Sequence, residues 1–149
     1  MVPTTRRHLL RSVPVALSVG IAGCAGLDVG SASPPTVETL RAENENTAEH
    51  TVFALLLTDG EPVFADSVEL AAYNPETNNP RRATFEGVPT DEPVDTLYAW
   101  RDDQRRDDWQ KADLTQTGNE CEDVSIRIRN EESVPDEPLT LRHSLIGCE

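Results

Sequence analysis

Short runs in which hydrophobic and polar residues alternate are the feature that most constrains the fold of this chain. The clearest run is residues 124–129 (VSIRIR), where every second side chain is apolar and its neighbours are polar or charged. Successive side chains of a strand point to opposite sides, so this period of two indicates a β-strand with one buried face. We find no convincing 3.6-residue apolar stripe of the kind that an amphipathic helix requires. The chain is therefore expected to form β-structure.

Eight strand candidates follow the first 35 residues. They are residues 37–42, 50–57, 63–70, 82–86, 94–101, 107–114, 122–129 and 139–145. Clusters rich in Pro, Gly, Asn and Asp separate them, and Asp59-Gly60 between two apolar runs is a hairpin signal. We predict an all-β, antiparallel Ig-like β-sandwich of about 7–8 short strands. Ig-like refers to the architecture only, because both tryptophans precede Cys121 and Cys148.

The charge of the chain argues against one class of partner. After residue 23 there are 27 acidic and 10 basic residues, a formal charge of −17, and Lys111 is the single lysine. Nucleic acid is not expected to bind, because phosphate recognition needs a basic surface. Repulsion of this size is well screened only in concentrated salt, where the Debye length falls to about 3 Å at 1 M. The composition predicts adaptation to high salt; an acidic surface that faces carbohydrate or cations is the alternative.

The first 23 residues have the layout of an export signal. Arg6, Arg7 and Arg11 form a positive start without any acid, and an apolar stretch follows at residues 12–21. That stretch is too short to span a membrane, which takes about 20 residues. Small residues and Cys24 come next, as they do at the end of a secretory signal.

Two motifs in this segment resemble known signals. Residues 5–11 (TRRHLLR), with Arg6 and Arg7, resemble a twin-arginine (Tat) signal, although Thr5, Leu9 and Arg11 differ from its most frequent residues. Ile21-Ala22-Gly23-Cys24 resembles a lipobox, in which a lipoprotein signal peptidase cuts before the cysteine. Each motif is weak alone, but both occur in the right order around an apolar run of the right length. The chain is similar to small haloarchaeal lipoproteins.

This resemblance implies an organisation in three parts. Residues 1–23 would be the Tat/lipoprotein signal peptide, residues 24–35 a lipid-anchored tether and residues 36–149 the β-sandwich domain. Cys24 would carry a diacyl- or dialkyl-type lipid and hold the domain on the outer face of the cytoplasmic membrane. The Tat export machinery and the signal peptidase would be transient partners. The alternative is an uncleaved N-terminal helix with an incidental buried cysteine.

Cys121 and Cys148 are expected to form a disulfide, the default for a domain outside the cell membrane. If residues 122–129 and 139–145 form a hairpin, the two cysteines lie near its open end. A closed loop of about 28 residues would stabilise the fold by roughly 3.5 kcal/mol on the chain-entropy model. Two free thiols are the alternative.

The sequence offers no recognisable catalytic, metal or cofactor site. Residues 101–109 (RDDQRRDDW) hold four carboxylates, but they lack the glycine and closing Glu of a calcium loop, so a solvated hairpin with cross-strand Arg–Asp pairs is predicted. His8 lies in the signal segment, and His50 and His143 are far apart, without a second histidine at zinc-ligand spacing. No Gly-x-Ser-x-Gly elbow and no Gly-rich phosphate loop is present.

The function predicted from these observations is a membrane-anchored, non-enzymatic binding or structural module. An envelope protein, a glycan or a solute could be its ligand. One alternative is an accessory subunit of a transporter or cell-surface complex, which an exposed apolar patch would support. Another is a small hydrolase, which would need a convergent polar pocket, for example around His143.

Overall fold

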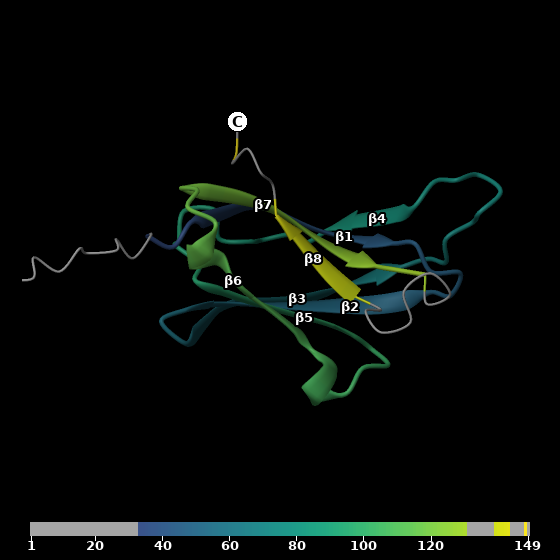
Figure 1. Ribbon diagram of the computed structural model, residues 1–149, viewed down its shortest axis with the longest axis horizontal. Helices are drawn as coiled ribbons and strands as arrows, with labels where there is room; N and C mark the ends of the chain where they lie inside the picture. Colours follow the sequence, from purple (N-terminus) through teal and green to yellow (C-terminus); the bar gives the residue numbers. More distant parts are fainter. Residues whose placement is uncertain (1–32, 131–138, 144–147, 149) are drawn as a thin grey trace, which may run out of the picture. The chain divides into compact units, whose positions relative to one another are not determined.

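The strands form two four-stranded sheets that pack face to face (Figure 1). The computed structural model describes residues 33–130, 139–143 and 148, which belong to one compact unit, Ser31–Glu149. The first sheet has the order β4-β1-β7-β8 and the second the order β3-β2-β5-β6. The bounds are β1 Thr36–Asn44, β2 His50–Thr58, β3 Glu61–Leu70, β4 Arg81–Thr84, β5 Thr96–Arg101, β6 Gln110–Asp113, β7 Cys121–Ile128 and β8 Leu139–His143. The predicted β-sandwich is confirmed.

Alternation along the strands creates the core between the sheets. In β7, Val124, Ile126 and Ile128 are fully buried, while the residues between them are half-buried and polar. Fully buried Val52 and Leu56 of β2 are among the residues that the second sheet contributes. Burial of such side chains stabilises the fold by about 1.5–3 kcal/mol each, which makes this core the main source of stability.

One strand pair departs from the predicted antiparallel arrangement. β1 and β7 run parallel, with Thr36 beside Cys121 and Asn44 beside Ile128, while every other named pair is antiparallel. A parallel pair needs a long connection. β1 and β7 have one, because strands of both sheets lie between them in the sequence.

The β2–β3 hairpin confirms its sequence signal. Asp59 and Gly60 connect the strands, with φ of 51° and 81°. Positive φ at both central residues is the requirement of a type I′ turn, whose twist matches that of the flanking strands. Asp tolerates this conformation and Gly adopts it without steric cost.

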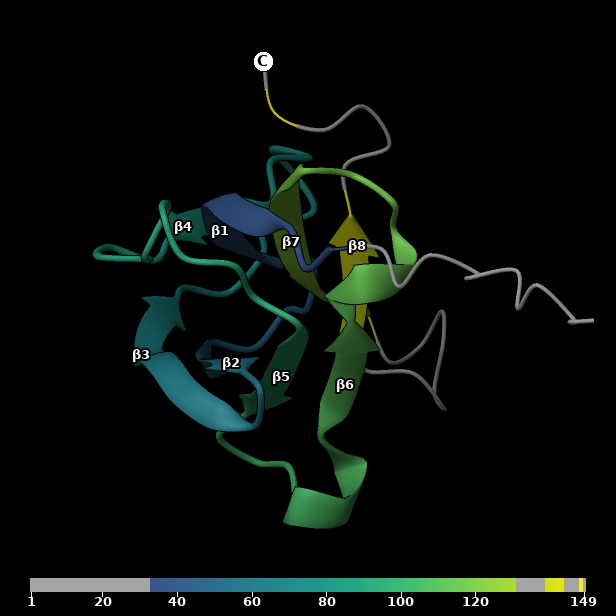
Figure 2. The same ribbon diagram turned by 90° about the vertical axis from the view of Figure 1, so that its left-hand side faces the viewer.

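The segment predicted as one strand at residues 107–114 is interrupted. A 3₁₀ helix, η1 (Arg106–Asp108), precedes β6, and a second one, η2 (Leu114–Gln116), follows it. The β5–β6 connection extends beyond the second sheet, on the side away from the first (Figures 1 and 2).

The predicted cross-strand Arg–Asp pairs are wrong. The pairs are local: Arg101 Nε binds Asp103 Oδ1 at 2.8 Å, and Arg105 Nε lies 3.7 Å from Asp108 Oδ2. Their short separations along the sequence allow these contacts within the turn and η1.

No helix within the described parts of the chain is long and apolar enough to cross a membrane.

Candidate functional site

The residues of the predicted signal and anchor lie outside the described part of the chain. These are Arg6, Arg7, Ile21, Ala22, Gly23 and Cys24. The domain begins its first strand at Thr36. The signal peptide and the lipid attachment therefore stay predictions.

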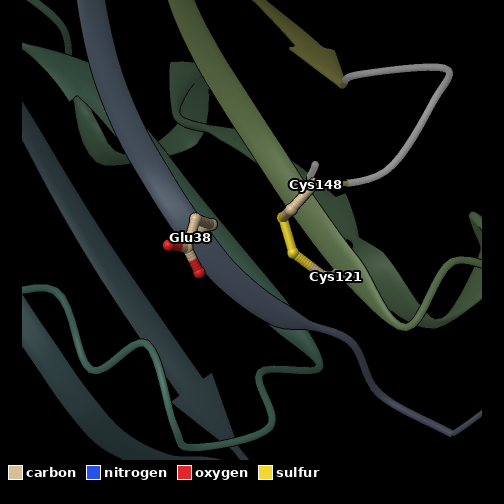
Figure 3. A group of neighbouring side chains, drawn as sticks. All are labelled: Glu38, Cys121 and Cys148. Carbon is tan, nitrogen blue, oxygen red and sulfur yellow. A yellow bond between two sulfur atoms is a disulfide. The ribbon is translucent and has the colours of Figure 1, made fainter.

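The predicted disulfide joins Cys121, the first residue of β7, to Cys148. Their Cα atoms are 5.6 Å apart, within the usual range for a disulfide. Figure 3 shows the Glu38 side chain beside this bond, and its carboxylate lies within 4.8 Å of the sulfur atoms. Two bonded sulfurs cannot serve as thiolate ligands, so the bond has a structural role and these three residues do not form a metal site.

His50 lies at the start of β2, next to the β5–β6 connection. Its side chain is 9% exposed, and its Nδ1 is 3.5 Å from Asp102 Oδ1. The potential ligand atoms of His50, Asp102 and Asp103 lie within 4.8 Å of one another. Both carboxylate oxygens of Asp103, however, accept hydrogen bonds from Arg101 at 2.8 Å. Because the guanidinium occupies Asp103 and adds a positive charge, this group is a poor cation site. His143 ends β8, and its side chain lies outside the described residues.

The outer face of the second sheet carries a cluster of apolar side chains, which we call the aromatic face. Its strand residues are Phe53, Leu55, Leu57, Tyr98 and Trp100, which pair with one another across β2 and β5 or alternate with core residues. They are half-buried, and none belongs to the core or to the partly buried residues that pack on it. A contiguous apolar patch of this kind typically marks an interaction surface.

Three rings of the aromatic face form a parallel stack. Trp100 lies between Phe53, at 5.3 Å and 5°, and Trp109, at 3.9 Å and 10°. The Arg106 guanidinium lies 5.7 Å from the centroid of Trp109. Both ring faces of Trp100 are therefore covered, so the ring presents an edge to any partner and has no open face on which a flat ligand could stack.

The outer face of the first sheet carries a polar hollow, which we call the arginine pocket. It has a volume of about 430 Å³, and arginines from all four strands line it. The strand register arranges its surroundings in two rows across the sheet. One row is Thr84, Arg41, Ser125 and Arg142; the other is Arg82, Glu43, Arg127 and Thr140.

The second row of the arginine pocket is internally charge-paired. Glu43 is 4% exposed although it faces outward, because arginines on both sides cover it. Arg82 donates from Nε and Nη2 to Glu43 Oε1 at 3.0 and 2.8 Å. Arg127 Nη2 lies 3.1 Å from Glu43 Oε2, and its Nη1 lies 3.3 Å from Glu45 Oε1.

Both surfaces were missed from the sequence. Alternation gives the outward positions of β1 and β7, such as Arg41, Glu43, Ser125 and Arg127, but it does not say that these strands are neighbours. Trp109 precedes β6 and has no strand periodicity that would place it on Trp100.

The chain matches no family model, no curated protein and no solved structure.

Proposed function

We propose that the protein is a lipid-anchored lipoprotein on the outer face of the cytoplasmic membrane, with its β-sandwich as a non-enzymatic binding module. The observation that carries this proposal is the Cys121–Cys148 disulfide, since such bonds persist in oxidising compartments and are rare in the cytosol. It agrees with the twin-arginine and lipobox resemblances, which lead to the same side of the membrane. Cys24 is then the remaining cysteine, and lipid attachment gives it a role.

The intact mass of the protein extracted from membranes tests the anchor. The expected mass begins at Cys24 with a lipid added, and rises by about two mass units when the disulfide is reduced. Cys24→Ser should abolish the lipid mass and release the protein from the membrane fraction. Cys148→Ser is the matched control, because it removes the disulfide and should leave the lipid. An unlipidated full-length mass would overturn the anchor and the export argument with it.

A second candidate function, the accessory subunit of a cell-surface complex, is favoured by the aromatic face. Aromatic residues are enriched where proteins bind each other, and Trp100, at the centre of the stack, has no open ring face on which a sugar could stack. Leu55 and Tyr98 are paired across β2 and β5 on this face, away from the core.

Co-purification from native membranes distinguishes this candidate. A partner that copurifies with the wild type should be lost when Leu55→Gln and Tyr98→Gln are combined. Thr84→Gln, on the outer face of the other sheet, is the control and should retain it. A partner retained equally by both variants, or a wild type that elutes alone, would refute the accessory role.

A further inference from the structure

In the first row of the arginine pocket, two arginines face a single described carboxylate, Asp123, which also lines the pocket. Arg41 Nη2 approaches Asp123 Oδ2 only to 4.0 Å, and the Arg41 side chain is 44% exposed. Arg142 is exposed and has no ion pair with any described residue. This row thus differs from the second one, where Glu43 and Glu45 engage both arginines.

Arg41, Ser125 and Arg142 are direct neighbours across three strands. Ser125 pairs with Arg41 in β1 and with Arg142 in β8, so it lies between two arginines in the row, and all three residues line the pocket. A guanidinium offers a planar fork of N–H donors that matches two oxygens of one oxyanion, and a serine hydroxyl adds an O–H donor. We propose that this row binds a small oxyanion, a ligand whose phosphate, sulfate or carboxylate group is held by Arg41 and Arg142 over Ser125.

The second row, which lies beside the first on the same face of the sheet, also contributes to this site. Arg127 Nε is a buried donor without an acceptor among the described residues. Most buried side-chain polar atoms have a partner, so an added acceptor could satisfy this donor. Asp123, which also lines the pocket, likewise leaves one buried oxygen, Oδ1, without a partner among the described residues. Arg127 also lines the pocket, beside Ser125.

The charge of the rest of the chain makes this local concentration of arginine notable. Ten basic residues follow residue 23, and four of them line this pocket, while the chain as a whole has a net charge of −14. Long-range attraction therefore cannot bring an anion here, and recognition depends on short-range hydrogen bonds. Short-range hydrogen bonds are less sensitive to salt than long-range electrostatic attraction. This kind of recognition therefore suits a protein that is expected to work in concentrated salt.

The inference deepens the proposed binding role by giving the class of ligand, and it rests on that role only for its biological meaning. Binding is measured on the isolated full chain, whereas anchoring is measured as a mass. A failure of one therefore leaves the other standing.

Titration of the full-length protein with inorganic phosphate, sulfate and citrate, followed by amide NMR, tests the site. At least one probe should give saturable shifts that centre on Arg41, Ser125 and Arg142. The double variant Arg41→Gln/Arg142→Gln should weaken that binding about tenfold or more, as the loss of charge-assisted hydrogen bonds requires. Arg142→Gln alone keeps the test valid if the double variant fails to fold.

The matched control is Arg105→Gln/Arg106→Gln, which removes the same charge from the β5–β6 connection on the other sheet. It should change the dissociation constant by less than about twofold, since exposed charges beyond a Debye length are screened. Equal weakening by both double variants would mean general electrostatic attraction and would overturn the site. Absence of saturable shifts with all three probes would do the same.

Discussion

Glu43 should contribute far more to stability than the neighbouring outward-facing acid. Its side chain is 6% exposed, and it accepts three close contacts from Arg82 and Arg127. Removing one partner of a fully buried ion pair costs about 3–5 kcal/mol. Here Arg82 is 61% exposed and regains water readily, while Arg127 is 25% exposed and keeps Glu45 as a partner. We therefore expect Glu43→Ala to lower the free energy of unfolding by about 2–3 kcal/mol.

Glu45→Ala is the matched comparison, because it removes the same charge two residues away and also loses a contact with Arg127. Its side chain is 34% exposed, and the contact is 3.3 Å long, so a loss below about 1 kcal/mol is expected. Urea unfolding of the full chain at one fixed NaCl concentration measures both. The Glu43 effect should persist at 1 M NaCl, where exposed pairs are screened. Equal losses in the two variants would refute the reasoning that burial sets the strength of this cluster.

Three further outcomes are expected. Cys121→Ser/Cys148→Ser should lower the free energy of unfolding by roughly 3.5 kcal/mol in urea, since the bond closes a long loop; an unchanged midpoint would contradict this. Lowering NaCl from molar to millimolar should reduce the melting temperature, because repulsion among the excess carboxylates is then poorly screened; a flat melting temperature would argue against salt adaptation. Hydrogen bonds from the side chains of Thr115 and Gln116 hold the pKa of Asp113 below its ordinary value. Its stabilising effect is therefore present above the ordinary pKa and lost as pH falls through the lowered one, and Thr115→Val should raise that pKa in carboxyl carbon-13 NMR.

Much of the architecture follows from local pattern. The alternation in residues 124–129 correctly predicts which side of β7 is buried, and Asp59-Gly60 correctly predicts a hairpin. The disulfide is predicted from the expected extracellular setting, and the flanking strands indicate that its two cysteines lie close together. The first two signals lie within a few residues of the feature that they predict.

A buried carboxylate and the arginine pocket could not be predicted in this way. Glu122 has the phase of the core residues and is fully buried, where its Oε1 accepts a hydrogen bond from Asn119 at 2.7 Å. A pattern of apolar and polar residues does not anticipate a carboxylate inside. The arginine pocket likewise depends on β1 lying between β4 and β7, and strand order is a property of the assembled sheet.

The position of β1 has a mechanical consequence. Among the described residues it is the first strand, yet it lies inside its sheet, with β7 along its length on one side and β4 beside Arg41–Asn44 on the other. A load applied through the residues before Thr36 would act along β1 and would have to slide it past both neighbours at once. An edge strand could instead peel away one hydrogen bond at a time. β7 runs parallel to β1, and the disulfide joins it to Cys148 at the end where β1 begins. We therefore expect the domain to resist unfolding by a force that pulls on its N-terminal side.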